Sequence, residues 1–247
     1  MTEEPVIYNS VAPLRNVRAM AELLDRVQSR DRDLPGMACF YGPSGFGKTT
    51  AASWNANRLR AYWVQMRSTW TAKKLCTSIL IDLGIAPART IADQVDQISD
   101  ELAKSGRPLL IDEADYLVSR HMIEVIRDIY ESSRATIILI GEETLPQKLQ
   151  KWERVHGRML DWVAAQPADL REVGILAGIR CKGIELEEDL QKLILSASNA
   201  SVRRVCVNLD RVREIARTRG LRRMSAADWG KGDFFTGAAP APRRISA

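Results

Sequence analysis

The chain contains, at residues 42–49, the stretch Gly42-Pro43-Ser44-Gly45-Phe46-Gly47-Lys48-Thr49. It matches the pattern G-x-x-x-x-G-K-[ST] at every fixed position, and an apolar run, residues 37–41, precedes it. This order predicts a buried strand, a glycine-rich turn and a helix, which together form a phosphate-binding loop. The alternative is an ordinary glycine-rich turn between a strand and a helix.

The residue types in this loop suit a nucleoside triphosphate. Gly42, Gly45 and Gly47 let the backbone N–H groups turn inward, where a side chain would obstruct the phosphates. Lys48 is expected to reach the β- and γ-phosphates, and Thr49 to place its hydroxyl on Mg²⁺. The loop therefore predicts a site for a nucleotide with Mg²⁺.

A second motif begins at Arg107, where a short apolar strand ends in Asp112 and Glu113. Asp112 is expected to hold Mg²⁺, and Glu113 to polarise a water molecule for attack on the γ-phosphate. A solvated acidic loop is the alternative for such a pair. Asp115 is interpreted as a cap of the helix that follows it.

Composition narrows the class of protein. The chain has 247 residues, 45% of them hydrophobic, and no apolar run approaches the length of a membrane span. The four cysteines lack zinc-ligand spacing, and the N-terminus lacks a signal-peptide core, so we expect a cytoplasmic protein. The net charge is +5, and the positive excess lies from Ala200 onward. That asymmetry favours a polyanion partner, with a solvated helix face as the alternative.

Alternating apolar strands and amphipathic helices predict an α/β fold, with a parallel sheet covered by helices on both faces, followed in the sequence by a small C-terminal helical lid. The strand pattern is absent after about Leu145, where a helix over 146–155 is expected. Residues 178–183 are interpreted as a short linker. The expected divisions are an N-terminal segment and helix (1–35), the α/β domain (36–166), a basic helical lid (167–236) and a disordered tail (237–247).

Over residues 12–224 this arrangement resembles an AAA+ ATPase, a family of P-loop ATPases with a helical lid. The resemblance implies ATP hydrolysis with Mg²⁺. It also implies a polar γ-phosphate sensor after the strand at 136–140, where this chain has Glu142, with Thr144 as a substitute. It implies an arginine finger acting in a neighbouring subunit, for which Arg158 is the first choice and Arg154 the second. The implied nucleotide contacts are Gly42, Pro43, Ser44, Gly45, Phe46, Gly47, Lys48, Thr49, Thr50 and, as second sensor, Arg203.

Within that family the details are similar to the target-capture ATPases of transposition, which include the B protein of transposable phage Mu and the TniB and TnsC regulators. The similarity is carried by Asn16 and by residues 41–50, 68–75 and 141–143. It implies ATP-bound subunits that form a helical filament or ring on double-stranded DNA, present that DNA to a transposase and stimulate strand transfer. No membrane partner is expected.

Basic side chains are the expected DNA contacts, because phosphate contacts give affinity without sequence preference. They are Arg67, Lys73, Lys74, Arg204, Arg211, Arg222 and Arg223. Trp70 either stacks on a base or packs against a helix. Two alternative functions stay open: a helicase loader or insertion-sequence helper that favours single strands, and a nucleotide-switched assembly scaffold with little turnover.

Overall fold

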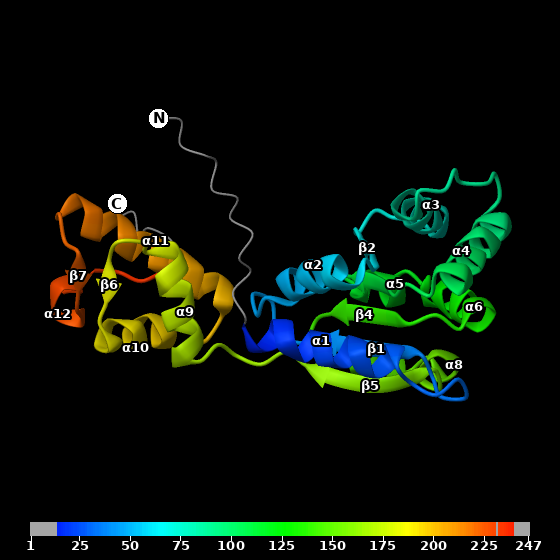
Figure 1. The fold of residues 1–247 in the computed structure, drawn as a ribbon, viewed down its shortest axis with the longest axis horizontal. Coiled ribbons are helices and arrows are strands. Elements are labelled where there is room, and N and C mark those ends of the chain that lie inside the picture. Colours follow the sequence, from blue (N-terminus) through cyan, green and yellow to red (C-terminus); the bar gives the residue numbers. More distant parts are fainter. Residues whose placement is uncertain (1–13, 231, 240–247) are drawn as a thin grey trace, which may run out of the picture. The chain divides into compact units, whose positions relative to one another are not determined.

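The structure is a computed structural model, and it describes residues 14–230 and 232–239. The chain folds as two compact units, Met1–Gln166 and Pro167–Ala247 (Figure 1). Residues 1–13 of the expected N-terminal segment and residues 240–247 of the expected tail lie outside the described residues.

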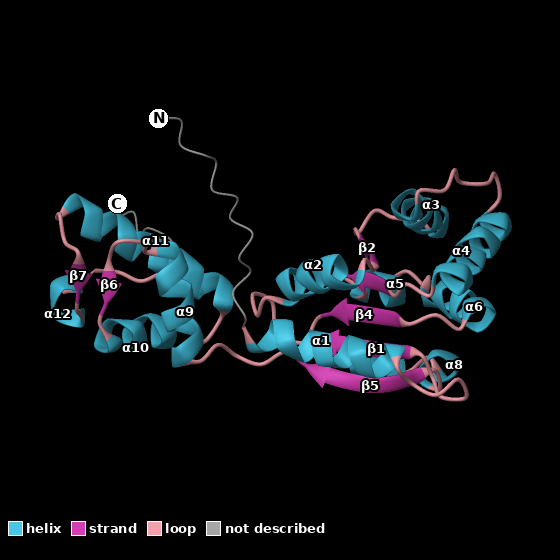
Figure 2. Ribbon diagram, viewed as in Figure 1, coloured by secondary structure: helices cyan, strands magenta, loops and turns pink. Residues whose placement is uncertain are grey.

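A five-stranded sheet forms the centre of the first unit (Figure 2). Its strands all run parallel, in the order β2-β3-β4-β1-β5. They are β1 (Met37–Tyr41), β2 (Tyr62–Gln65), β3 (Leu109–Asp112), β4 (Ile137–Gly141) and β5 (Met159–Ala164). Because parallel strands end at the same edge, the residues that follow β1, β3 and β4 come together there.

Helices cover both faces of this sheet, as the apolar runs of the central strands require. Cys39, Ile111 and Leu139 face a cluster that also holds side chains of α3, α4 and α6. Side chains alternate along a strand, so the equally buried Phe40, Leu110 and Ile138 face the side where α1 and α2 pack together. The predicted α/β class is therefore confirmed.

Capping residues mark both ends of the helices α3 and α4 of this unit. Thr71 and Thr90 accept the N–H groups of Lys74 and Asp93 at the starts of α3 and α4, and left-handed glycines end both helices. The eight helices of the described part of the unit are α1 (Arg15–Gln28), α2 (Lys48–Leu59), α3 (Ala72–Leu83), α4 (Ile91–Ser105), α5 (Asp115–Ser119), α6 (Ile123–Ser133), α7 (Leu145–Gln150) and α8 (Glu153–His156).

Two expectations for residues 145–166 are wrong. The single helix over 146–155 is two helices, α7 and α8, and the strand β5 follows them. This strand escapes a search for apolar runs because it is an edge strand: all of its residues are only half buried, and Asp161 lies in its middle.

The second unit is mainly helical. Its elements are α9 (Leu170–Arg180), β6 (Glu185–Leu186), α10 (Glu188–Ala197), α11 (Val202–Thr218), β7 (Arg223–Met224) and α12 (Ala226–Trp229), and β6 pairs with β7 in parallel. Capping boxes, Asp169 with Glu172 and Ser225 with Asp228, start α9 and α12. The expected start of the linker at residue 178 is wrong, because α9 continues through Gly178 to Arg180.

The segment after α12 is held against α11. The side chain of the buried Asn208 donates to the carbonyl of Phe235 at 3.1 Å and accepts its N–H at 2.7 Å. Gly237 lies close to the Arg204 guanidinium, so the described part of the expected tail, residues 237–239, begins beside α11. In the parts of the chain that the structure describes, no helix is long and apolar enough to cross a membrane.

Candidate nucleotide-binding site

The phosphate-binding loop connects β1 to α2 and needs glycine at two positions for different reasons. The N–H of Gly42 donates to the carbonyl of Gly141 at 3.3 Å, and a Cβ at Gly42 would lie 3.0 Å from that of Ala165. Gly47 is the N-cap of α2 and has φ of 82°, which other residues adopt at a cost. The loop therefore places the N-terminus of α2 toward the site, where N–H groups and the helix dipole favour an anion.

Lys48 lies in the mouth of this loop. Its Nζ donates to the carbonyls of Gly42 at 2.6 Å and Pro43 at 2.9 Å. Burial lowers the pKa of Lys48, while the carboxylates of Asp112, Glu113, Asp115 and Glu142 raise it. The ammonium is thus within electrostatic reach of the residues that follow β3 and β4.

The acidic pair at the end of β3 is only partly satisfied. The N–H of Glu113 donates to Oδ1 of Asp112 at 2.9 Å, whereas Oδ2 is buried without a hydrogen-bond partner among the described residues. Burial raises the pKa of Asp112, and a hydrogen bond from the nearby Thr49 hydroxyl opposes that rise. By ordinary distance and angle criteria Oδ2 has no hydrogen-bond partner among the described residues, so it is available to a ligand.

Glu113 lies in the left-handed region, with φ of 55°, which is uncommon outside glycine and turns. Burial raises the pKa of Glu113, and the charge of Asp112 adds to the rise. A strained, half-buried carboxylate beside an anion site has the features of a general base.

The residues present fit Mg²⁺. Asp112 offers a buried oxygen without a partner, and Thr49 offers a hydroxyl beside it, both hard oxygen ligands. No cluster of three or more metal-ligating His, Cys, Asp or Glu side chains occurs within residues 14–230 and 232–239. An ion at this site would therefore take most of its ligands from phosphate and water, as Mg²⁺ commonly does.

The end of β4 is held by Asp115, contrary to its expected role as a helix cap. Its Oδ2 accepts the N–H of Glu142 at 2.7 Å and its Oδ1 lies 2.6 Å from Nζ of Lys148. The N-cap of α5 is Ala114, with no side-chain cap. Glu142 and Thr144, the expected sensor positions, are both exposed.

The two finger candidates lie before β5. The N–H of Met37, at the start of β1, donates to the carbonyl of Arg158, so Arg158 lies at the edge of the sheet opposite the phosphate-binding loop. Its guanidinium contacts Glu131 of α6. Arg154, on α8, is exposed and has no ion-pair partner within the described residues. The role of either arginine in a neighbouring subunit stays a prediction.

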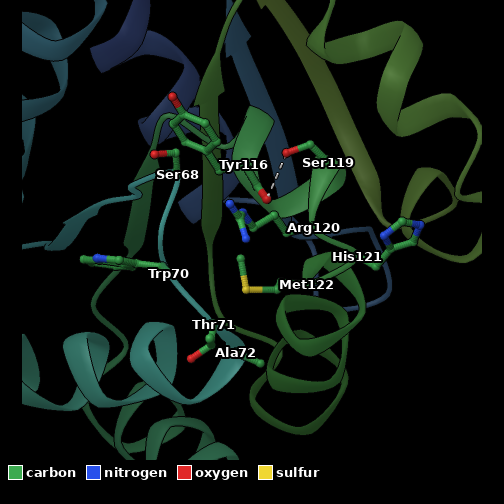
Figure 3. A pocket seen from close by; sticks show the side chains of 9 residues that line it. All are labelled: Ser68, Trp70, Thr71, Ala72, Tyr116, Ser119, Arg120, His121 and Met122. Atoms are coloured by element: carbon green, nitrogen blue, oxygen red, sulfur yellow. Dashed lines mark hydrogen bonds between the residues drawn. The ribbon is translucent and has the colours of Figure 1, made fainter.

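The three basic residues expected near α3 are all exposed. Nζ of Lys74 lies 5.9 Å from the ring centre of Trp70; Arg67 precedes this pair in the sequence, and Lys73 lies between its two members. An open pocket adjoins them, with Trp70 on the left, Arg120 and Met122 in the centre, Tyr116 above and His121 on the right (Figure 3). Its volume is about 720 Å³.

The basic residues expected in the second unit are partly engaged within it. Arg223 pairs with Glu187 at 2.9 Å, and Arg211 donates to the carbonyl of Asp233 and lies 5.6 Å from the ring of Phe235. Arg203, Arg211, Arg222 and Arg223 are exposed and Arg204 is half-buried. Arg203 lies in the first turn of α11, and its expected contact with a nucleotide stays a prediction.

Two residues with clear structural roles carried no motif. Asn16 of α1 donates to the carbonyls of Phe46 at 2.9 Å and Gln166 at 2.8 Å, so it ties the phosphate-binding loop to the end of the first unit. Lys148 pairs with Asp115 from a helix that only the fold brings near. The resemblance to the transposition ATPases is the only signal in the sequence for Asn16, and no local pattern points to Lys148.

The fold and the candidate site of this chain together are those of the P-loop class of α/β proteins. More narrowly, residues 31–149 match the family model described as an AAA domain, a range that includes both motifs and ends before β5. A comparison with curated proteins gives no match.

Solved structures of AAA+ ATPases share the fold. The ORC2 protein of Aeropyrum pernix, in ADPNP and ADP complexes, aligns with a TM-score of 0.71 and 17% identity over 89% of this chain and 68% of that one. The ORC1 protein of the same organism, in complex with DNA, gives 0.60 and 19% over 86% and 62%. The RuvB Holliday junction branch migration motor of Thermotoga maritima gives 0.56 and 19% over 86% and 66%. The chain thus spans about two thirds of the length of these structures, and at these identities the likeness shows the fold alone.

Proposed function

We propose that this chain is an AAA+ ATPase that binds ATP with Mg²⁺, assembles on double-stranded DNA without sequence preference and delivers that DNA to a transposase. The observation that carries the nucleotide chemistry is the meeting of Lys48, Thr49, Asp112 and Glu113 at one edge of the sheet. One buried oxygen of Asp112 there has no hydrogen-bond partner among the described residues, whereas a carboxylate with a purely structural role usually has partners for its buried oxygens.

Each of these residues has a step in hydrolysis. Phosphate oxygens replace the two loop carbonyls as partners of Lys48, whose charge then offsets that of the phosphates. Thr49 and Asp112 would hold Mg²⁺, which supplies further neutralising charge when bound. Glu113 takes the proton of the attacking water, and the burial that raises its pKa makes it a stronger base. Arg158 of a neighbouring subunit, or Arg154, stabilises the transferred phosphoryl group, and Arg203 contacts phosphate in cis.

DNA binding is supported by exposed cations in both units. Arg67, Lys73 and Lys74 are exposed and lie beside the Trp70 pocket, and none of the described residues that line this pocket is an Asp or Glu that would repel a phosphate backbone. In the second unit the candidates are the exposed Arg211, Arg222 and Arg223 and the half-buried Arg204, and the chain as a whole has a pI of about 9.1. Among the structures of similar fold, one is a DNA complex and another a motor for DNA branch migration.

The assembly and transposase steps have a narrower basis. They rest on the sequence similarity at Asn16 and at residues 41–50, 68–75 and 141–143. Self-assembly is also supported by the position of Arg158, which lies at the edge of the sheet away from its own phosphate loop.

The test is duplex DNA binding with a non-hydrolysable ATP analogue, with ADP and without nucleotide, followed by electron microscopy of the complexes. We expect filaments or rings only with the analogue. Lys48→Ala should weaken analogue binding at least ~100-fold, because it removes the charge that meets the β- and γ-phosphates, and should abolish assembly. The matched control is Lys151→Ala, which removes an exposed lysine on the end of α7.

Other outcomes would choose among the alternatives. DNA binding that is equally tight without nucleotide contradicts the proposal. A preference for single-stranded DNA favours the helicase-loader function. Assembly with no hydrolysis, even with DNA and transposase present, favours the scaffold.

A further inference from the structure

A second cation lies near the candidate nucleotide site, on α7. Nζ of Lys148 is 2.6 Å from Oδ1 of Asp115 and 3.7 Å from Oε2 of Glu142. The Lys148 side chain is 39% exposed and that of Asp115 only 12%. The ammonium is therefore held in place on one side and open to a ligand on the other.

Asp115 connects this cation to the catalytic region. It follows Glu113 by two residues, and its second oxygen accepts the N–H of Glu142 at the end of β4. A Cβ at Gly141 would collide with the Asp115 carboxylate, so the main chain of β4 approaches it closely. Lys148 is thus fixed relative to both β3 and β4 through one buried carboxylate.

The charges at the site do not balance without it. Four carboxylates, those of Asp112, Glu113, Asp115 and Glu142, act on Lys48. A nucleoside triphosphate adds roughly four negative charges, and Mg²⁺ offsets only about two of them. Glu142, at the position where related ATPases are expected to carry a polar γ-phosphate sensor, adds repulsion in place of a donor. An ammonium beside Glu142 removes that repulsion.

We propose that Lys148 is a specificity-determining residue that makes this site prefer a nucleoside triphosphate over the diphosphate. Its ammonium, held by Asp115 beside Glu142, supplies the positive charge for the γ-phosphate, which a diphosphate lacks. This inference rests on the nucleotide-binding part of the proposed function. A purely structural role is a weaker account, because the Lys148 side chain is 39% exposed, and solvent weakens what its ion pair with Asp115 contributes to stability.

The experiment measures the dissociation constants of a non-hydrolysable ATP analogue and of ADP, each with Mg²⁺, at fixed ionic strength. For Lys148→Met we expect ~10-fold weaker analogue binding and less than about 2-fold change for ADP, the loss typical of one charged hydrogen bond. Lys148→Arg should keep most of the preference. Lys151→Met, which removes an exposed charge from the end of the same helix, should change neither constant by more than about 2-fold.

Equal weakening of both nucleotides by Lys148→Met, or no change in either, would overturn the inference. ADP binding also reports that the variant is folded. If it is not, Glu142→Gln decides in its place: removing the carboxylate that faces Lys148 should strengthen analogue binding relative to ADP, and an unchanged ratio counts against the inference. If the wild-type protein binds the analogue but no DNA, the proposed function is contradicted, and the comparison of analogue and ADP binding by the Lys148 variants still tests this inference. A wild-type protein that binds neither nucleotide overturns both.

Discussion

The two halves of the candidate site are built in opposite ways. The phosphate half, which comprises the loop at 42–49 with Asp112 and Glu113, leaves groups short of partners: Oδ2 of Asp112 has none among the described residues. The β4 half, which comprises Asp115, Gly141, Glu142 and Lys148, is closed on itself, because both oxygens of Asp115 are occupied.

This difference separates two tasks. A group that must bind a ligand is held ready at a cost in stability, as the strained backbone of Glu113 also indicates. A group that positions others is fully hydrogen-bonded and therefore rigid. Substitutions in the phosphate half should change activity more than stability, and those in the β4 half should do the reverse, Lys148 apart.

Glu113→Gln should have the largest effect. It keeps the size of the side chain and removes its ability to take a proton, so we expect ATP turnover to fall by roughly 10²–10⁴-fold, with analogue binding nearly unchanged. The measurement is steady-state phosphate release with DNA present. The matched control is Glu143→Gln, which changes an exposed glutamate two residues before the start of α7 and should leave ATP hydrolysis at the wild-type rate. If the Glu113→Gln variant hydrolyses ATP at the wild-type rate, Glu113 is not the general base.

The phosphate half could be predicted from the sequence because its chemistry is local. The loop and the acidic pair each lie within one short segment, so residue type and spacing were enough to place them at the ends of β1 and β3. The central strands were predicted for a similar reason, since strands buried on both faces are continuous apolar runs.

The β4 half could not be predicted, because it joins segments that only the fold brings together. Asp115 and Lys148 are 33 positions apart, and nothing local distinguishes Asp115 from a helix cap. The edge strand β5 was missed because half-burial tolerates Asp161, which breaks the apolar pattern. A local sequence pattern cannot predict which distant segments pair, or which strand lies at the edge of the sheet.

Gly141→Ala tests whether the β4 half is tightly packed, by the change in the free energy of unfolding. The added Cβ would lie within 3.0 Å of both the Asp115 carboxylate and the Leu145 side chain. We expect a loss of about 1–3 kcal/mol in the free energy of unfolding, measured by urea denaturation. Gly178→Ala is the matched control: this glycine lies within α9 with open space around its Cβ position, so the change should stabilise by about 0.5–1 kcal/mol. Two equal effects would show that the β4 half has room to adjust.

Asp112→Asn should have the smallest effect on stability, and in the opposite direction. Burial raises the pKa of Asp112, so the native state binds a proton more tightly than the unfolded chain does. Wild-type stability therefore falls as the pH rises from the ordinary aspartate pKa to the raised one, and the neutral amide avoids that loss. At neutral pH we expect a gain of roughly 0.5–2 kcal/mol, the usual size for a single stabilising substitution, together with loss of Mg²⁺-dependent hydrolysis.

The pH dependence of that gain makes the test specific to the buried carboxylate. The gain should shrink as the pH falls toward the ordinary aspartate pKa, because the wild-type carboxyl then takes up the proton that removes its own penalty. Asp96→Asn removes the same charge from an exposed position on α4, and should give no pH-dependent gain. A destabilised Asp112→Asn variant at neutral pH would mean that the Thr49 contact outweighs burial, and that the phosphate half is as closed on itself as the β4 half.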